Sequence, residues 1–118
     1  MEQLIDLLRI IRAEHLIQAE VDLRMINLHH LFAADENNHN NIQLPEGWEQ
    51  LKGLCIRVTK IEDCYMVLGA IHEKWKSMGT FFRDFIANPE KEKKDFLFTI
   101  IIIDDVTPVP LRIEYGKL

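Results

Sequence analysis

The chain has 118 residues, of which 47% are hydrophobic and 28% are charged, and its formal net charge is −5. This composition predicts a single globular domain over residues 1–118 with a hydrophobic core. The negative charge argues against nucleic-acid binding, which favours a basic surface. No apolar run reaches the roughly 20 residues that span a bilayer, and no signal peptide opens the chain, so we expect a cytoplasmic protein without a membrane partner.

Hydrophobic spacing predicts the elements of the first half of the chain. A helix is expected at 1–18, a half-buried strand at 19–25 and a second helix at 28–34. An exposed polar loop at 35–41 and a turn at 45–47 follow. The strand residues expected to alternate towards the core are Val21, Leu23 and Met25.

The second half continues with a strand at 54–59 and a helix at 62–75. A long apolar strand is predicted at 96–104, a turn at 106–110 and a last strand at 111–115. The side chains expected on the buried side of the helix are Ile61, Tyr65, Leu68, Ile71 and His72. The order of elements predicts an α+β fold, a mixed β-sheet flanked by helices.

Several polar residues have two interpretations. His72 is either a satisfied core histidine or a general base. Asp104 and Asp105 form either a solvated turn or an acidic pair for a metal. The lysines at 91–94 lie either in a solvated loop or against a phosphate. Cys55 and Cys64 have no partner at metal-ligand spacing, so we interpret them as core thiols and expect no metal site.

Two stretches carry a specific resemblance. DCYMVLGAIHEKWK at 63–76 and FRDFIANP at 82–89 resemble the synthetase domain of RelA/SpoT proteins. That family reads D-C-Y-x-x-L-G-x-I-H-x-x-W-K and then F-K-D-Y-I-A-x-P-K-x-N-G-Y-x-S-L-H-T, in register without a gap from Asp63 to Thr99. AEVDLRMINLHHLF, LKGLCIRV and VPLRIEYG are similar to further segments of that domain, so the resemblance covers nearly the whole chain.

The resemblance implies a nucleotidyltransferase-like RelA/SpoT synthetase fold that is truncated at the C-terminus. It also implies the activity of the bacterial stringent response, in which pyrophosphate passes from ATP to GDP or GTP with magnesium. Of the family's phosphate-side and motif residues, this chain keeps Arg24, Arg57, Lys76, Arg83 and His72, which we interpret as a residual nucleotide-binding set.

The working positions of the family depart from its pattern. The magnesium-binding aspartate falls on Lys52 and the catalytic glutamate on Arg112, which reverses the charge at both positions. Glu114, two residues further on, is a possible substitute, with Asp104 or Asp105 as a second ligand. The guanine-stacking tyrosine, the histidine of S-L-H and an ATP-contacting arginine fall on Lys94, Phe98 and Phe81.

The resemblance therefore predicts a degenerate synthetase domain without catalytic residues or a cofactor, retained for binding, assembly or regulation in guanosine tetraphosphate metabolism. One alternative is a sensor that binds GDP, GTP or guanosine tetraphosphate without turnover. The other is a residual pyrophosphokinase, which would need magnesium. We also expect a homo-oligomer or a protein partner, because a strand as apolar as residues 96–104 in a small sheet can leave apolar surface to cover.

Overall fold

The computed structural model of the chain describes residues 2–15, 17–28, 31, 44–87 and 95–117. The predicted polar loop at 35–41, residues 29–30 and 32–34 of the predicted second helix, and the charged run at 90–94 lie outside these residues. In the part of the chain that is described, neither helix is long and apolar enough to cross a membrane.

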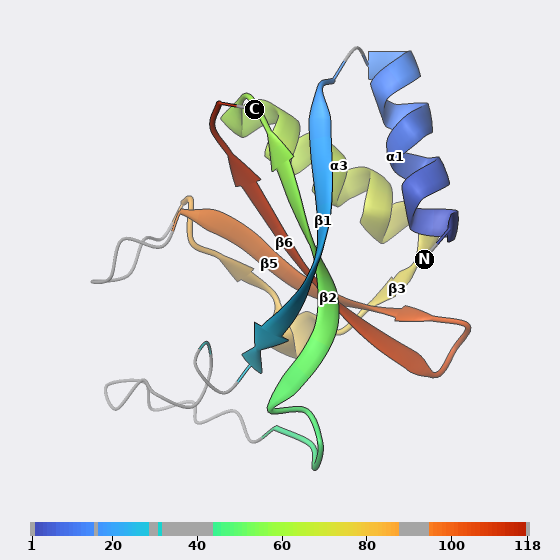
Figure 1. Cartoon of the computed structure of the whole chain (residues 1–118), viewed down its shortest axis with the longest axis vertical. Coiled ribbons are helices and arrows are strands. Elements are labelled where there is room, and N and C mark those ends of the chain that lie inside the picture. Colours follow the sequence, from blue (N-terminus) through green and yellow to red (C-terminus); the bar gives the residue numbers. More distant parts are fainter. Residues whose placement is uncertain (1, 16, 29–30, 32–43, 88–94, 118) are drawn as a thin grey trace.

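A six-stranded mixed sheet forms the centre of the molecule (Figure 1). Its strands are β1 (Ala19–Asn27), β2 (Gln50–Val58), β3 (Lys76–Ser77), β4 (Arg83–Asp84), β5 (Phe96–Ile103) and β6 (Thr107–Tyr115). The order is β1-β2-β6-β5-β3, and β4 pairs with β5 as well. Only β2 and β6 pair in parallel within this sheet, so the predicted mixed sheet is confirmed.

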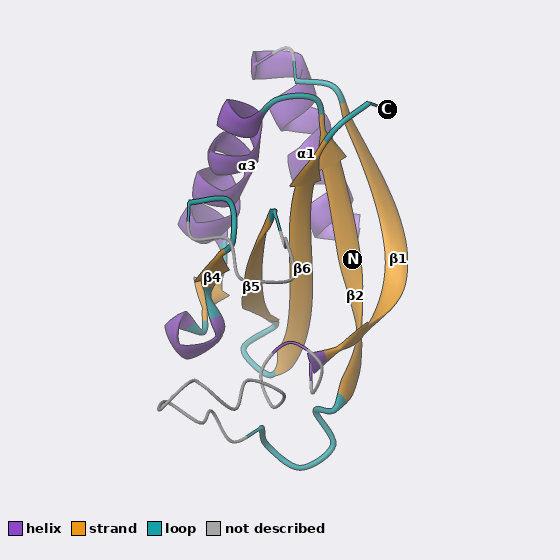
Figure 2. Ribbon diagram, turned by 90° about the vertical axis from the view of Figure 1, so that its left-hand side faces the viewer, coloured by secondary structure: helices purple, strands orange, loops and turns teal. Residues whose placement is uncertain are grey.

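Two helices cover one face of the sheet, α1 (Glu2–His15) and α3 (Ile61–Lys74) (Figure 2). A short 3-10 helix, η1 (Gly79–Phe81), follows β3. The first turn of α3 carries Glu62 and Asp63, where negative charge suits the helix dipole. The arrangement agrees with the predicted α+β class.

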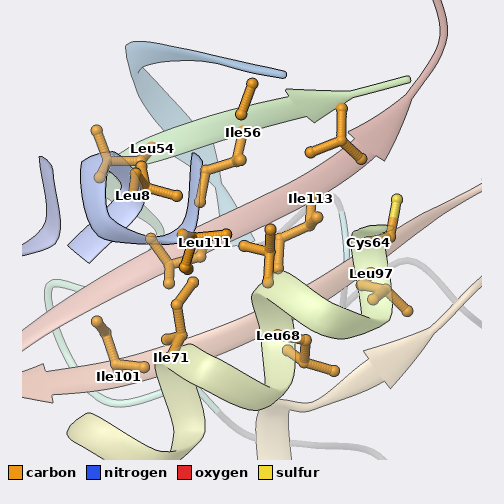
Figure 3. Packing of buried hydrophobic residues seen from close by; sticks show 14 of the residues in the cluster. Leu8, Leu54, Ile56, Cys64, Leu68, Ile71, Leu97, Ile101, Leu111 and Ile113 are labelled. Atoms are coloured by element: carbon orange, nitrogen blue, oxygen red, sulfur yellow. The ribbon is translucent and has the colours of Figure 1, made fainter. Parts of the chain in front are cut away.

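The main hydrophobic core lies between the sheet and the helices (Figure 3). From the sheet it takes Leu54, Ile56, Val58, Leu97, Ile101, Val109, Leu111 and Ile113. From α3 it takes Cys64, Val67, Leu68 and Ile71, which have the i, i+3, i+4, i+7 spacing of one helical stripe. The predicted buried side of this helix was therefore wrong by part of a turn, because Ile61 and Tyr65 are 42% and 38% exposed.

A second, smaller cluster lies on the other face of the sheet. Its buried members are Leu28, Phe81, Phe85, Phe96, Phe98 and Ile100. Phe96, Phe98 and Ile100 alternate along β5 with the main-core residues, so β5 is buried on both faces, as predicted from its apolar composition. The rings of Phe85 and Phe96 meet edge-on at 5.1 Å between centroids.

The predicted turn at 106–110 was wrong, because β6 begins at Thr107. Pro108 and Pro110 are strand residues opposite Ile102 and Ile100 of β5. The pairing of β6 with β2 begins only at Leu111, so the other edge of this part of β6 has no ladder to satisfy. Proline lacks an N–H, and such an unpaired edge is where a strand tolerates it.

The chain reverses between β5 and β6 at Asp104 and Asp105, which have φ angles of 56° and 63°. Both are exposed, and the N–H of Val106 donates to the carbonyl of Ile103 at 3.3 Å. Aspartate tolerates this left-handed conformation better than most residues. The solvated turn was thus the correct interpretation of this pair.

Strand β1 is less covered than its alternation predicts. Val21 is partly buried, but Leu23 and Met25 are 58% and 62% exposed. α1 lies beside the half of β1 that begins at Ala19, and the strand continues beyond it (Figure 1). An alternating pattern predicts which side chains share a face, but the length of the covering helix decides how many are buried.

We expect Gly53→Ala to destabilise the fold by about 1–3 kcal/mol, the usual range for overpacking. A Cβ at Gly53 would lie 2.2 Å from the backbone oxygen of Pro110, and backbone cannot move aside as a side chain can. Urea unfolding measures the change. The control is Gly69→Ala in α3, where a Cβ meets nothing within 4 Å and helix propensity predicts a small gain. Equal midpoints for Gly53→Ala and the unaltered protein would contradict the close approach.

Candidate functional site

Seven side chains gather on the sheet face opposite the helices, and we call this group the charged face. Its members are Glu20, Asp22 and Arg24 of β1, Cys55 and Arg57 of β2, and Arg112 and Glu114 of β6. The strand register sets six of them in two rows, Glu20 opposite Arg57 opposite Glu114, and Asp22 opposite Cys55 opposite Arg112, while Arg24 lies opposite Gly53. They share a face because each strand alternates them with residues of the main core.

Glu114 is held between two arginines. Its Oε1 lies 3.3 Å from Nε of Arg57, and its Oε2 accepts a hydrogen bond from Nε of Arg112 at 3.1 Å. The Glu114 side chain is 15% exposed, against 45% and 42% for the two arginines. Both carboxylate oxygens therefore already face a cationic donor, which leaves little of their charge for a metal ion or a substrate proton.

A pocket of about 330 Å³ opens on the charged face, lined by Glu20, Asp22, Arg24, Cys55, Arg57 and Glu114. It holds three carboxylates against two guanidinium groups. Arg24 also lies 3.5 Å from a carboxylate oxygen of Asp22. A polyphosphate site needs a surplus of positive charge, and this lining does not supply one.

Cys55 lies at the floor of this pocket and is 3% exposed. Burial raises the pKa of its thiol to about 11, and neighbouring Glu114 adds to the shift. At neutral pH the sulfur is therefore protonated, whereas a nucleophilic cysteine must be a thiolate. The predicted core thiols are confirmed in that Cys55 and Cys64 are both buried and free.

A second pocket, of about 220 Å³, adjoins the first and shares Arg24 and Cys55 with it. Its apolar wall includes Phe96, Phe98, Ile26 and Leu31. The guanidinium carbon of Arg112 lies 4.0 Å from the centroid of the Phe96 ring, a cation–π contact that fixes the arginine over β5. The two pockets together offer one polar and one apolar compartment.

The structure brings together only part of the predicted nucleotide-binding set. Arg24 and Arg57 line the same pocket. Arg83 lies on β4, opposite Phe98 of β5. From β4 to β2, the strand of Arg57, there are three strand-to-strand steps, or about 14 Å at the usual strand spacing. Its Nη1 donates to the carbonyls of Thr80 and Phe82 at 3.1 and 2.7 Å. Lys76 lies on β3 at the far edge of the sheet.

His72 lies on the opposite face of the sheet from this pocket. Its Nε2 is 2.9 Å from the hydroxyl oxygen of Thr99, which is fully buried. The Phe82 ring stands edge-on to the imidazole at 6.1 Å between centroids. Burial lowers the pKa of His72 from its ordinary value of 6.5. A neutral, hydrogen-bonded histidine at the helix–sheet interface fits the interpretation as a core residue.

A second pair of motif residues has a similar arrangement. The hydroxyl of Tyr65 donates towards both carboxylate oxygens of Asp84, at 3.0 and 2.8 Å. The same carboxylate accepts from the backbone N–H groups of Ile86 and Ala87 at 3.1 and 2.9 Å. Tyr65 thus ties α3 to the turn after β4. Both pairs, Tyr65–Asp84 and His72–Thr99, join one matched motif of the sequence to the other.

The departures from the family pattern fall in different places. Arg112 is on the charged face, but Lys52 alternates with it and shares the side of Leu54 and Ile56. The charge reversal at Lys52 therefore does not bear on this pocket, whereas the reversal at Arg112 does. Phe81 and Phe98 belong to the second hydrophobic cluster, and Lys94 lies outside the described residues.

The suggested replacement ligands do not meet. Strand β6 begins at Thr107, seven residues before Glu114, so its extended backbone separates these two residues by roughly 23 Å. Asp104 and Asp105 lie in the turn that precedes Thr107. Glu114 therefore cannot share a metal with Asp104 or Asp105. Among the described residues, no three His, Cys, Asp or Glu side chains are grouped to hold a metal ion.

Sequence reasoning missed Glu20, Asp22 and Cys55 as members of the site. The available signal was the alternation of residues 20, 22 and 24 along β1, which predicts a charged face on that strand alone. It could not indicate that Arg57 and Glu114 would complete the face, because their pairing depends on the order of the strands.

Curated proteins with similar sequences carry names that refer to GTP pyrophosphokinase or to (p)ppGpp synthesis and hydrolysis. "GTP pyrophosphokinase" of Haemophilus influenzae is 25% identical over 105 residues, which are 89% of this chain and 14% of that protein. "GTP pyrophosphokinase" of Streptomyces antibioticus is 35% identical over 64 residues, 54% of this chain and 8% of that protein. "Bifunctional (p)ppGpp synthase/hydrolase RelA" of Mycobacterium tuberculosis is 32% identical over 64 residues, 54% of this chain and 9% of that protein.

The similarity to these proteins supports a RelA/SpoT-type domain in this chain and so confirms the resemblance read from the two motifs. The chain spans only a small fraction of the length of each relative. No family model matches the chain.

We expect the stability of the protein to fall more steeply on acidification than that of His72→Gln. Because the folded pKa of His72 is lowered, the unfolded chain binds a proton more readily than the folded one. The stability contributed by neutral His72 is fully present above the unfolded pKa and is lost as the pH falls through the folded pKa. Glutamine can keep a hydrogen bond to Thr99 but does not titrate. Urea unfolding of both proteins between pH 7 and pH 5 measures the difference, and parallel pH profiles would contradict the assignment.

Proposed function

We propose that this chain is a catalytically inactive domain with the nucleotidyltransferase-like fold of RelA/SpoT synthetases. Its role would be binding, assembly or regulation in guanosine tetraphosphate metabolism. The observation that carries the proposal is the arrangement around Glu114, a carboxylate two residues from Arg112, the position of the family's catalytic glutamate. Its two oxygens face Arg57 and Arg112 at 3.3 and 3.1 Å.

Pyrophosphoryl transfer depends on a metal that neutralises phosphate charge and on groups that position the reactants. In this pocket, carboxylates and guanidinium groups are paired with each other instead. A metal would have to displace an arginine from Glu114, and a phosphate would have to compete with three carboxylates for two arginines. The charge balance therefore supports the loss of catalysis.

The contacts that join the matched motifs support the other half of the proposal. Tyr65–Asp84 and His72–Thr99 hold α3 against the sheet and the β4 turn. These residues have a role in folding whether or not a substrate binds. A domain kept for binding or assembly needs them, and it does not need the metal ligand or the base.

A nucleotide sensor is a second candidate function, and the two adjoining pockets favour it. The polar pocket contains Arg24 and Arg57, and the apolar pocket beside it contains the rings of Phe96 and Phe98. A nucleotide presents the same pairing of a charged and an aromatic part. A ligand of this kind would have to break the ion pairs of Glu114 or Asp22 to reach the arginines.

We expect the purified protein to form no guanosine tetraphosphate or pentaphosphate from ATP and GDP or GTP in the presence of magnesium. An active GTP pyrophosphokinase in a parallel reaction controls the assay. Product above background would overturn the inactive assignment. In that case Glu114→Gln distinguishes use of this pocket from a contaminating enzyme, since only an activity of the pocket is lost in the variant.

Calorimetric titration with GDP, GTP, ATP and guanosine tetraphosphate separates the two candidate functions. If the sensor is correct, one ligand releases heat, and Arg57→Ala weakens its binding about 10-fold or more, the usual loss of a charged hydrogen bond. Arg9→Ala on α1 is the matched control, because Arg9 is exposed and pairs only locally with Asp6 in the described contacts. Absence of binding by all four ligands removes the sensor and leaves the assembly role.

A further inference from the structure

Strand β1 forms an open edge of the sheet. It pairs with β2 on one side, and no strand of the described residues pairs with its other side (Figure 2). A free edge presents unpaired N–H and C=O groups to any other strand that can approach. Proteins often block such an edge with proline, lysine or a bulge, but residues 19–27 contain no proline or lysine and pair with β2 in one continuous register.

The same edge exposes two large apolar side chains. Leu23 is 58% exposed and Met25 is 62% exposed. They alternate with Asp22 and Arg24, whose side chains lie on the charged face. The strand therefore has an apolar side and a charged side, both at the open edge, and a partner strand of matching pattern can cover both at once.

We propose that β1 pairs in an antiparallel arrangement with β1 of a second copy of this chain. The twofold axis that relates the copies passes midway between their Leu23 residues, and we call this an axis through Leu23. The two six-stranded sheets then continue into one. This inference rests on the assembly role proposed above and gives it a partner and a surface. The pairing places Leu23 opposite Leu23 of the second copy, Val21 opposite Met25, and Asp22 opposite Arg24.

The register follows from symmetry and charge. Directly opposite residues of an antiparallel pair point to the same face, so a twofold axis must pass through a residue and not between two. An axis at Arg24 sets Arg24 against itself. An axis at Asp22 also forms two Glu20–Arg24 pairs, but it sets Asp22 directly against Asp22 at the centre. An axis through Val21 sets Glu20 against Asp22. An axis through Leu23 sets Asp22 against Arg24 twice, which favours this register over its neighbours.

Forming the dimer breaks only a weak interaction of the single chain, the ion pair between Asp22 and Arg24. Asp22 and Arg24 lie 3.5 Å apart within one strand, with side chains 67% and 52% exposed. An exposed ion pair of this kind contributes little to stability in water. The dimer exchanges the two pairs within its copies for two pairs across the new strand boundary. Asp22 and Arg24 therefore stay partnered, and Leu23 and Met25 become covered.

Charge reversal tests the register. We expect the unaltered protein to sediment as a dimer. Asp22→Arg sets Arg24 against an introduced arginine twice, and Arg24→Asp sets two aspartates together twice, so each variant alone has a dissociation constant raised about 10-fold or more. A mixture of the two variants restores opposite charges at both positions and forms a heterodimer. Glu73→Arg, the same charge change on the exposed side of α3, is the matched control and leaves the dimer intact.

Several outcomes would overturn the proposal. One is a monomer at millimolar concentration of the unaltered protein. Another is a dimer that survives both single reversals. A third is folded single variants, checked by circular dichroism, that fail to pair when mixed. None of these results depends on nucleotide synthesis, so failure of the dimer and failure of the inactive assignment are seen in separate experiments.

A crosslink locates the axis independently. With Leu23→Cys, the two introduced thiols lie opposite each other, at a Cα separation of about 4.5–5.5 Å that suits a disulfide. We expect mild oxidation to give a covalent dimer, since the native Cys55 and Cys64 are buried. Val106→Cys, on the exposed β5–β6 turn, is the control and should remain mostly uncrosslinked. Equal crosslinking of both variants would contradict an axis at Leu23.

Discussion

The parallel pairing of β2 with β6 determines what lies on each face of the sheet. Leu54 and Ile56 meet Leu111 and Ile113 on the side of the helices, and Cys55 and Arg57 meet Arg112 and Glu114 on the other. One register thus builds the centre of the main core and, one residue out of phase, the ion pairs of the charged face. A slip of one residue would place arginines under α3, so burial of the apolar side stabilises the arrangement of the charges as well.

Several residues in the two motifs that resemble RelA/SpoT synthetases make contacts that stabilise the fold. Tyr65 and Asp84 come from different motifs and share a hydrogen bond, as do His72 and Thr99. These polar contacts fix the position of α3 against β5 and the β4 turn. The same residues would be needed in an active enzyme and in an inactive relative. Their presence therefore indicates the type of domain but not whether it is active. The charges around Glu114 are the observation that bears on activity.

The charged face and the open edge of β1 use the same strand for two purposes. Asp22 and Arg24 border the pocket and also stand at the edge where a second copy can pair. In such a dimer, opposing Asp22–Arg24 pairs hold the arginine beside a carboxylate of the partner strand, which further neutralises the pocket. In that dimer the same charges would select the pairing register of β1 and keep a pocket arginine beside a carboxylate.

The sequence alone determined the type and approximate limits of α1, β1, β2, α3 and β5, because periodicities of 3.6 and 2 are local properties of the chain. The motif resemblance pointed to Arg24 and Arg57, which line one pocket in the structure. Only the tertiary structure decided that Pro108 and Pro110 lie in a strand, that His72 faces the core and that Lys52 points away from Arg57. The physical reason is that each of these depends on how separate segments pair. Pro108 and Pro110 depend on the pairing of β6 with β5, and His72 on the buried hydroxyl of Thr99. Lys52 depends on the pairing with β1 that extends β2 back to Gln50.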